Sequence, residues 1–425
     1  MYAYAACEDA VLLYPLYALL FVEHGLSPAA VSSLFALWSL TAFLTEVPSG
    51  VLADLVPRRL LLVFSPLLTA AGFALWTLAP GFGAFAAGFV LWGIGGSLRS
   101  GTWQAYIHAE LTALGRVDAY PRLTGRAEAV GTMSALVAAV AAGPVLAVGG
   151  FVTVGLASVA APLMAAALAL ALPHTRTTMT AAGPGGPAGP AGPGEACDAA
   201  DGGRDACSSV GGEQETGSPR VLRQGLAALR RSAATRVAVA MVAGLAAILT
   251  LDEYLPLLVA DTGLPPSLVP AGYGIMLAGI AVGAWLADRG TRHPGRVLAA
   301  GGCALAVGAL SATPVGLVGV AVAFGVLQWA AVQADTRLQQ VVPDSSRATV
   351  TSLAGSVSEI ASVGVFGFWA AGSVWAGPTM LFGCAGLPVL LLAGTWRRSS
   401  SRPVRAAIRC CTVRLKRGAN RSTKR

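Results

Sequence analysis

The sequence predicts an all-α membrane protein whose twelve transmembrane helices form two related six-helix bundles. Three observations support this prediction: the composition, the recurrence of long apolar segments, and an internal repeat. Of the 425 residues, 55% are hydrophobic and only 12% are charged, whereas soluble domains carry about 25% charged residues. Because so few charges cannot cover the surface of a soluble protein of this length, the composition argues against an ordinary soluble enzyme.

Twelve apolar segments are each long enough, at about 20 residues, to cross a membrane as a helix. They run at residues 3–22, 29–51, 60–79, 83–107, 125–147, 150–172, 235–259, 266–287, 295–312, 314–335, 349–372 and 376–396. The two sets of six predict one bundle over residues 1–173 and a second over 235–396. The intervening residues 174–234 are rich in glycine and proline, which predicts a flexible linker without a core of its own.

The basic residues lie on one side of the predicted membrane. Apart from Arg99, which lies inside the fourth segment, they occupy the linker, the tail at 397–425 and the even-numbered loops, while the other loops contain none. Basic loops stay in the cytoplasm during insertion, which predicts cytoplasmic termini and a cytoplasmic linker. The abundance of Ala, Gly and Arg with almost no lysine is typical of GC-rich bacterial genomes, so we expect the bacterial inner membrane.

Several kinds of chemistry lack the residues they need. The only lysines, Lys416 and Lys424, lie in the tail, so the body of the chain offers no Walker lysine for ATP. The four histidines form no HExxH pair and the seven cysteines no CxxC pair, so we expect neither a metal nor a cofactor. The tail holds eleven of the 29 basic residues and is either an interfacial helix on anionic lipid or disordered. Without a folded nucleic-acid-binding module, the net charge of +8 predicts no nucleic-acid partner.

Two landmarks recur in the same order in both halves. EHGLSP at 23–28 matches DTGLPP at 261–266 with an offset of 238, and GVLADLVPRR at 50–59 matches AWLADRGTRH at 284–293 with an offset of 234. Two matches at equivalent topological places and at nearly one offset indicate a duplicated six-helix unit. Parallel repeats of this kind are a transporter architecture in which the substrate site lies between the halves near the middle of the membrane.

The second landmark resembles a known family. GVLADLVPRR resembles the Gly-x-x-x-Asp-x-x-x-Arg-Arg signature between helices 2 and 3 of the Major Facilitator Superfamily, and SGTWQAYIHAEL at 100–111 and PDSSRATVTSL at 343–353 are similar to segments of its bacterial members. The resemblance implies close helix packing at Gly50 and a cytoplasmic gating contact among charged residues of both copies, namely Asp54, Arg58, Arg59, Asp288 and Arg292. The second copy departs from the pattern with Ala284 and Trp285. The alternative is a static ion pair that only fixes topology.

Ionisable residues inside the spans are candidates for proton coupling or substrate binding, because each costs about 2.5–3.5 kcal/mol to insert. These residues are Glu8, Asp9, Glu46, Arg99, Glu128, Asp252, Glu253, Asp335 and Glu359, and Gln328 and Gln333 are further polar candidates. In the family that the chain resembles, spans 1 and 4 both line the cavity, so we expect Asp9 or Glu8 to meet Arg99. The depth of Asp252, Glu253 and Glu359 favours a functional role.

The remaining candidates keep a structural interpretation beside the functional one. Glu8 and Asp9 reach water if they lie at the cytoplasmic start, Glu46 precedes the helix-breaking Pro48, and Glu128 and Asp335 lie near arginines. Gly143-Pro144 followed by Gly149-Gly150 resembles the GPxxGG element of proton antiporters only weakly, and a helix end is the favoured interpretation. Some aromatic residues either line a cavity for amphipathic cargo or pack in the interior, namely Tyr14, Tyr17, Trp38, Trp103, Tyr254 and Trp329.

The functional prediction combines the resemblance with the charges inside the spans. We expect a secondary active transporter, resembling bacterial drug exporters, that exports a small organic or drug-like molecule by alternating access in exchange for protons. An uptake permease for a metabolite, working as a symporter or facilitator, is the alternative within the same fold. A membrane-embedded enzyme or sensor is less favoured because the sequence shows no reactive cluster. The expected partners are the small molecule, protons and the lipid bilayer, and the expected state is a monomer.

Overall fold

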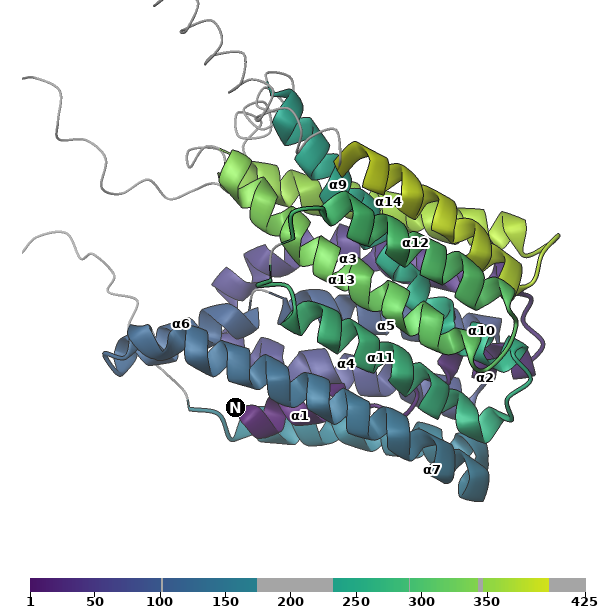
Figure 1. The fold of residues 1–425 in the computed structure, drawn as a ribbon. Helices are drawn as coiled ribbons and strands as arrows, with labels where there is room; N and C mark the ends of the chain where they lie inside the picture. The colour runs from purple at the N-terminus through teal and green to yellow at the C-terminus, as the bar shows by residue number, and fades with distance from the viewer. Residues whose placement is uncertain (101, 174–231, 290, 343–346, 397–425) are drawn as a thin grey trace, which may run out of the picture.

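The computed structural model describes residues 1–100, 102–173, 232–289, 291–342 and 347–396. Within this part of the chain the regular structure is entirely helical. The predicted tail and nearly all of the predicted linker lie outside the described residues. Figure 1 shows the long helices running side by side across the molecule.

The helices divide into an N-half and a C-half, and their bounds follow the predicted segments closely. The N-half contains α1 (Tyr2–Asp9), α2 (Tyr17–Glu23), α3 (Pro28–Leu55), α4 (Arg58–Leu78), α5 (Phe82–Arg99), α6 (Thr102–Ala113), η1 (Val117–Ala119) and α7 (Tyr120–Leu170). The C-half contains α9 (Ala233–Leu249), η2 (Thr250–Tyr254), α10 (Leu255–Asp261), η3 (Pro266–Leu268), α11 (Val269–Trp285), α12 (Pro294–Leu310), α13 (Gly316–Val341), α14 (Arg347–Gly372) and a last helix, Pro378–Trp396.

Nine helical segments of the described chain are long and apolar enough to cross a membrane. Three additions bring the total to twelve crossings. Val117–Leu170 spans 54 residues and turns back at Gly150, where φ is 65° and ψ is −171°, so this segment crosses twice. The shorter apolar helix Pro294–Leu310 adds a further crossing, and α1 with α2 makes the first one. The chain therefore has the predicted fold of twelve membrane helices in two related bundles.

The first predicted segment is not one continuous helix, and neither is the seventh. The chain leaves the helical path between Asp9 and Tyr17, where Pro15 lacks an N–H, and the backbone N–H of Leu13 donates to the Ser158 hydroxyl at 2.9 Å. The seventh segment is interrupted by η2, which the repeat offset of 238 aligns with residues 12–16. Both halves thus break their first helix at aligned positions, and in the N-half the Ser158 side chain satisfies one of the freed backbone groups.

The internal repeat is visible in the backbone at its first landmark. Gly25 ends α2 with φ +82° and Gly263 ends α10 with φ +81°, a conformation that other residues rarely adopt. The sequence offset between the two glycines is the predicted 238. The shared Gly-Leu pair therefore serves as the same helix stop in each half.

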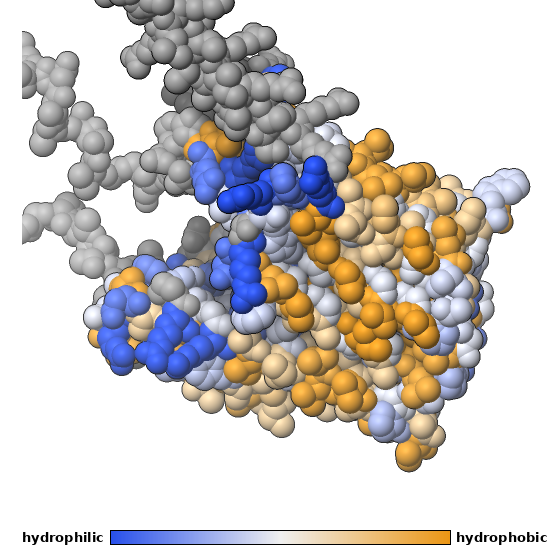
Figure 2. Space-filling model, viewed as in Figure 1, coloured by the Kyte–Doolittle hydropathy of each residue, from blue (hydrophilic) through white to orange (hydrophobic). Residues whose placement is uncertain are grey.

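The outer surface fits a lipid environment. Large apolar side chains stand exposed on many helices, including Leu44 at 60%, Val307 at 71% and Leu391 at 73%. Figure 2 shows apolar side chains over much of the visible face and hydrophilic ones gathered toward the end where the chain leaves residue 173 and returns at 232, here called the linker end. A water-soluble monomer does not expose so much apolar surface, so the chain is a multi-pass membrane protein.

The interior joins the two halves at one end only. At the end away from the linker, here called the opposite end, one continuous core contains Phe21 and Phe35 of the N-half together with Leu258 and Trp369 of the C-half. At the linker end each half has its own smaller core, one around Tyr106 and the other around Leu338. The halves are therefore packed together at the opposite end and separate at the linker end.

Candidate functional site

A cavity of about 320 Å³ lies between the halves, next to the continuous core on the side of the linker end. The N-half supplies Trp38, Ser39 and Ala42 from α3. The C-half supplies the other lining residues from α9, η2 and α14, namely Leu249, Thr250, Asp252, Glu253, Glu359, Ser362 and Phe366. The location between the two repeats is where substrate sites of repeat-built transporters lie.

Three of the carboxylates predicted from sequence meet at this cavity: Asp252, Glu253 and Glu359. The break at η2 places Asp252 and Glu253 side by side in a tight turn at the end of α9. Glu359 accepts a hydrogen bond from the Ser39 hydroxyl at 2.6 Å, and this bond links α14 to α3 across the halves. The Thr250 and Ser362 hydroxyls, 2.9 Å apart, bond to one another.

An inter-half aromatic cluster closes the cavity toward the opposite end and consists of Phe35, Tyr254, Phe366 and Trp369. Tyr254 stacks on Trp369 with ring centroids 4.0 Å apart and meets Phe35 edge-on at 5.1 Å. Its buried hydroxyl donates to the Ser32 hydroxyl at 2.8 Å, which joins η2 to α3. Phe366 both lines the cavity and contacts Phe35. These contacts separate the cavity from the opposite end of the molecule.

A second polar site lies wholly within the N-half. The Arg99 Nε lies 3.2 Å from the Glu8 carboxylate, so α5 and α1 are joined by the ion pair expected from the sequence. Glu8, Asp9 and Arg99 line a small cavity of about 70 Å³ together with Tyr14, Ser65, Thr69, Trp92, Gly96 and Pro162. Asp9 also lies directly against Gly131 of α7, where an added Cβ would collide with its carboxylate oxygen. This space is large enough for water but not for a drug-sized molecule.

A ladder of three stacked aromatic rings connects the two polar sites. Tyr14 lines the N-half cavity and stacks on Trp92 with centroids 5.6 Å apart, and Trp92 stacks on Trp38 at 4.8 Å. Trp38 in turn lines the cavity between the halves. Tyr14 and Trp38 were predicted from the sequence as cavity candidates, whereas Trp92 was not, because a tryptophan in a hydrophobic helix carries no signal that distinguishes this position.

Other aromatic candidates pack in the interior. Tyr17 is buried in the continuous core and Trp103 stacks on Tyr4 with centroids 4.9 Å apart. The Trp329 indole donates to the Arg289 carbonyl at 3.3 Å, and the Gln333 amide donates to the Ala287 carbonyl. Trp329 and Gln333 thus bind backbone carbonyls of the loop after α11. For Trp329 this agrees with the alternative of interior packing, and neither side chain lines either of the two cavities.

The residues of the implied gating contact lie at the linker end. In this conformation Arg58 donates to the Ala105 carbonyl at 3.4 Å and Arg59 donates to the Ala169 carbonyl at 3.3 Å in the last turn of α7. A cation at a helix C-terminus is favourable because the last carbonyls lack intrahelical partners. The side chain of Asp54 lies outside the described part of the structure.

Two of the expected features are not present at the linker end in this conformation. A Cβ on Gly50 would meet no described atom within 4 Å, so the close packing implied for this glycine does not occur here. Asp288 and Arg292 are both exposed, and within the described residues neither forms an ion pair. The separation of the halves at this end explains both observations, because the helices that would meet there are apart.

Three sequence candidates lie away from both cavities. Glu46 is exposed near the linker end and accepts a hydrogen bond from Ser100 at 3.2 Å. Gln328 is half-buried on α13 and lines neither cavity. Gly143 lies where α7 crosses η3, and a Cβ there would collide with the Ser267 carbonyl. Gly143 therefore permits close approach of the halves at the opposite end, while Gly150 makes the turn between spans 5 and 6.

Comparison with known proteins agrees with this architecture. The family model described as Major Facilitator Superfamily matches residues 5–366. The crystal structure of the nucleoside transporter NupG is similar with a TM-score of 0.65 and 12% identity, covering 93% of this chain and 96% of that chain. The crystal structure of a bacterial homologue of the iron transporter ferroportin, in an inward-facing state, is similar with a TM-score of 0.64 and 14% identity. The match covers 94% of this chain and 96% of that chain.

A D-xylose-proton symporter has a TM-score of 0.57 and 15% identity, covering 93% of this chain and 95% of that chain. No curated protein matches the sequence. Similarities at these identities establish the fold and leave the substrate open, because one fold hosts many functions. The family match spans most of the sequence and agrees with the two six-helix halves, so the chain is a transporter that belongs to the Major Facilitator Superfamily.

Proposed function

We propose that the protein exports a small organic or drug-like molecule by alternating access in exchange for protons. The observation that carries this proposal is the carboxylate-lined cavity between two halves that are packed together at one end and separate at the other. Such an arrangement allows the halves to rock about a central site, so that the site opens to one side at a time. The exporting role resembles that of bacterial drug transporters.

The sidedness of the proposal follows from the basic residues. The basic loops lie at the end where the described chain stops at residue 173 and resumes at 232, and loops of this composition remain cytoplasmic in a bacterial inner membrane. The described conformation is then open toward the cytoplasm and closed toward the outside by the inter-half aromatic cluster. Cargo bound from the cytoplasm is released outside once this cluster separates and the linker ends of the halves meet.

Proton coupling is proposed for the N-half site together with the central carboxylates. The N-half site holds two carboxylates, Glu8 and Asp9, against one guanidinium, Arg99. One negative charge is in excess there, and a proton can neutralise it. Carboxylates inside the membrane that face a cavity are the usual carriers of protons in pumps and transporters.

The charged residues at the linker end are proposed to act in the other conformation. When the halves close on the cytoplasmic side, Arg58 and Arg59 exchange their backbone carbonyl partners for carboxylates of neighbouring helices. Gly50 then permits close approach, and Asp288 with Arg292 forms the corresponding contact of the second repeat. A contact made in one state only shifts the balance between the two states by its own interaction free energy.

Everted membrane vesicles containing the full chain test this function. Respiration acidifies their interior, a pH-sensitive dye reports the gradient, and compounds from a drug-like panel are added one at a time. We expect dye fluorescence to recover for at least one compound, and Asp252→Asn and Glu359→Gln to lower that response at least tenfold. Glu23→Gln, which removes an exposed carboxylate outside both cavities, is the matched control.

Two outcomes would count against exchange with protons. The first is that no compound dissipates the gradient and the two variants transport as well as the unchanged protein. The second is that whole cells accumulate a compound only when the protein is present, which favours the alternative of an uptake permease. Depletion of the compound from energised cells supports export.

A further inference from the structure

We propose that the cargo is an organic cation, bound by the carboxylates of Asp252, Glu253 and Glu359 against the ring of Trp38. This proposal rests on the proposed function, because it takes the cavity between the halves as the cargo site. It adds the chemical class that the site selects: an amine or quaternary ammonium group on an apolar body.

The charge of the cavity is the first argument. Its lining contains three carboxylates and, among the described residues, no lysine, arginine or histidine. The N-half site, by contrast, supplies Arg99 to Glu8 at 3.2 Å. Uncompensated carboxylates inside a membrane protein are costly, so the central group needs positive charge from outside the chain. A cationic cargo provides it.

The second argument is independent of the number of acids. Glu253 is half-buried, lines the cavity, and its carboxylate has no hydrogen bond or ion pair among the described residues. Trp38 also lines the cavity, and its stacking on Trp92 at 4.8 Å with 20° between the planes fixes the orientation of its ring. Tryptophan is the strongest partner for a cation among aromatic side chains. An unpartnered carboxylate beside a fixed indole suits an ammonium group.

The remaining lining residues argue for recognition by charge and shape rather than by hydrogen bonds. The Ser39 hydroxyl is committed to Glu359, and the Thr250 and Ser362 hydroxyls are committed to one another. Leu249, Ala42 and Phe366 supply apolar surface. A quaternary ammonium, which has no N–H to donate, can therefore bind here through its charge, the indole face and apolar contact.

The size and donor set argue against a bare metal ion. The cavity of about 320 Å³ is far larger than the roughly 30 Å³ share of one water molecule and falls within the range of small-molecule pockets. No group of three or more His, Cys, Asp or Glu in the described chain is arranged to hold a metal ion. An ion with an apolar body fills this space, whereas a bare ion does not.

Equilibrium binding to the full-length protein in lipid nanodiscs tests the inference. The probe is radiolabelled phenyltrimethylammonium, and the competitors are its neutral isostere tert-butylbenzene and the anion benzenesulfonate, each at equal free concentration. Tetraphenylphosphonium and tetraethylammonium extend the cation series. We expect at least one cation to bind saturably, and the neutral and anionic competitors to be at least tenfold weaker.

Substitutions assign the binding to named residues. Glu253→Gln and Glu359→Gln are expected to weaken binding at least tenfold, and Glu23→Gln leaves it unchanged. Trp38→Leu is expected to weaken binding by about threefold to thirtyfold, the fold-change of one cation–π contact, with partial rescue by Trp38→Phe. Thermal unfolding of each variant shows whether it folds, and Trp38→Phe supplies a milder change if Trp38→Leu does not.

The outcomes separate this inference from the proposed function. If none of the three cations binds, if benzenesulfonate binds as tightly, or if the carboxylate variants bind normally, the cargo is not a cation, while proton-coupled flux of another compound would leave the exporter proposal intact. If a cation binds at these residues but no coupled flux is seen for any compound, the inference stands and the exporter proposal falls.

Discussion

The carboxylate cluster in the N-half and the carboxylate cluster between the halves differ in whether the chain supplies a counter-ion. In the N-half, Glu8 and Asp9 share a cavity of about 70 Å³ with Arg99. Between the halves, Asp252, Glu253 and Glu359 share a cavity of about 320 Å³ without any basic lining residue among those described. A paired and enclosed group can bind and release a proton without a ligand, whereas an unpaired group beside a larger space requires something from outside.

The difference is instructive because both groups depend on equivalent helix breaks. The break after α1 and the break at η2 align at the repeat offset of 238. In the first repeat Tyr14 and Pro15 lie within the break, while Asp252 and Glu253 occupy the aligned positions of the second. Duplication thus placed the same backbone interruption in each half, and substitution then gave the two copies different chemistry.

The largest expected effect comes from removing the counter-ion that distinguishes the two sites. Arg99→Gln leaves Glu8 and Asp9 without a cation inside the N-half. Breaking a fully buried pair costs about 3–5 kcal/mol, and because the Arg99 side chain remains 40% exposed we expect about 1–3 kcal/mol here. Thermal unfolding in detergent should show a clear fall in Tm, and transport should be lost.

The double variant Glu8→Gln with Arg99→Gln sharpens this expectation. It removes one charge of each sign, so most of the lost stability should return although transport does not. Equal Tm values for the single and double variants would mean that the pair contributes nothing to folding, and the contrast between the two sites would then lose its energetic basis. Glu23→Gln, which removes an exposed carboxylate that lines neither cavity, is the control for charge removal alone.

An intermediate effect is expected at the inter-half aromatic cluster, which closes the central cavity but not the N-half cavity. Tyr254→Phe removes the buried bond to Ser32 and keeps the ring stack on Trp369. A bond of this kind contributes about 0.5–1.5 kcal/mol, so the closed opposite end should become about twofold to tenfold less favoured. Tyr17→Phe, which removes the hydroxyl of a tyrosine whose aromatic neighbours all belong to the N-half, is the matched control.

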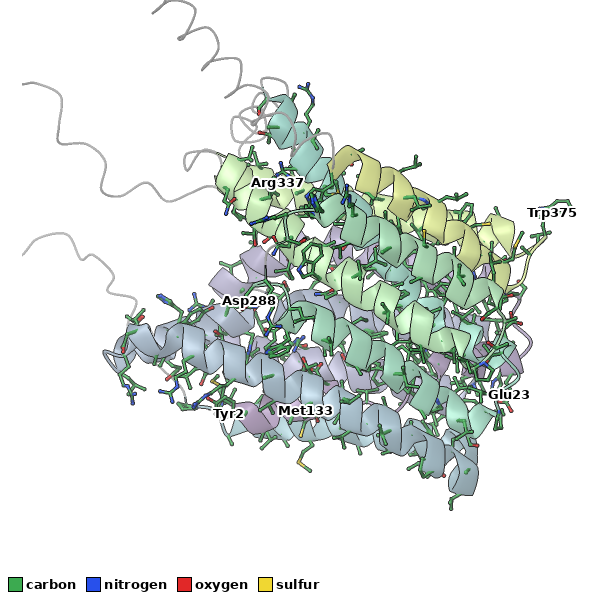
Figure 3. All side chains as sticks on the ribbon, in the orientation of Figure 1. Tyr2, Glu23, Met133, Asp288, Arg337 and Trp375 are labelled. Atoms are coloured by element: carbon green, nitrogen blue, oxygen red, sulfur yellow. The ribbon has the colours of Figure 1, made fainter. Side chains whose placement is uncertain are left out.

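Pulsed electron paramagnetic resonance can measure this shift with spin labels at positions 23 and 375. Glu23 and Trp375 stand at the opposite end in different halves, as Figure 3 shows. In a background without the native cysteines, Tyr254→Phe should increase the population of long distances. An unchanged distance distribution would show that the Tyr254–Ser32 bond does not hold the halves together.

The sequence predicted the architecture well because membrane helices are strongly constrained by hydropathy, positive charge and repetition. The twelve segments and the repeat at Gly25 and Gly263 follow from these signals, whereas the expectation that Asp9 or Glu8 meets Arg99 came from the family resemblance. The sequence also predicted a functional role for the carboxylates of η2 and α14, but their meeting at one cavity depends on how the halves pack.

What the sequence could not give are contacts that depend on conformation or on long-range packing. Arg58 and Arg59 bind backbone carbonyls here because the linker ends are apart, and no motif specifies the state of the molecule. Trp92 links the two sites only because α5 packs beside α3, which carries Trp38, and beside the segment between α1 and α2, which carries Tyr14. Hydropathy treats such a tryptophan like any other apolar residue.

The smallest expected effect comes from displacing Asp9 without changing its charge. A Cβ on Gly131 would collide with the Asp9 carboxylate, whereas a Cβ on Gly125 of the same helix would meet nothing within 4 Å. Gly→Ala in a helix otherwise stabilises by about 1 kcal/mol, so Gly125→Ala should raise Tm and Gly131→Ala should not. Because the central cavity is untouched by this change, Gly131→Ala should lower proton-coupled flux severalfold while cation binding stays within twofold. Equal losses of flux and binding would mean that a change in the N-half site also disturbs cargo binding, so that the N-half site and the central cavity form one functional unit.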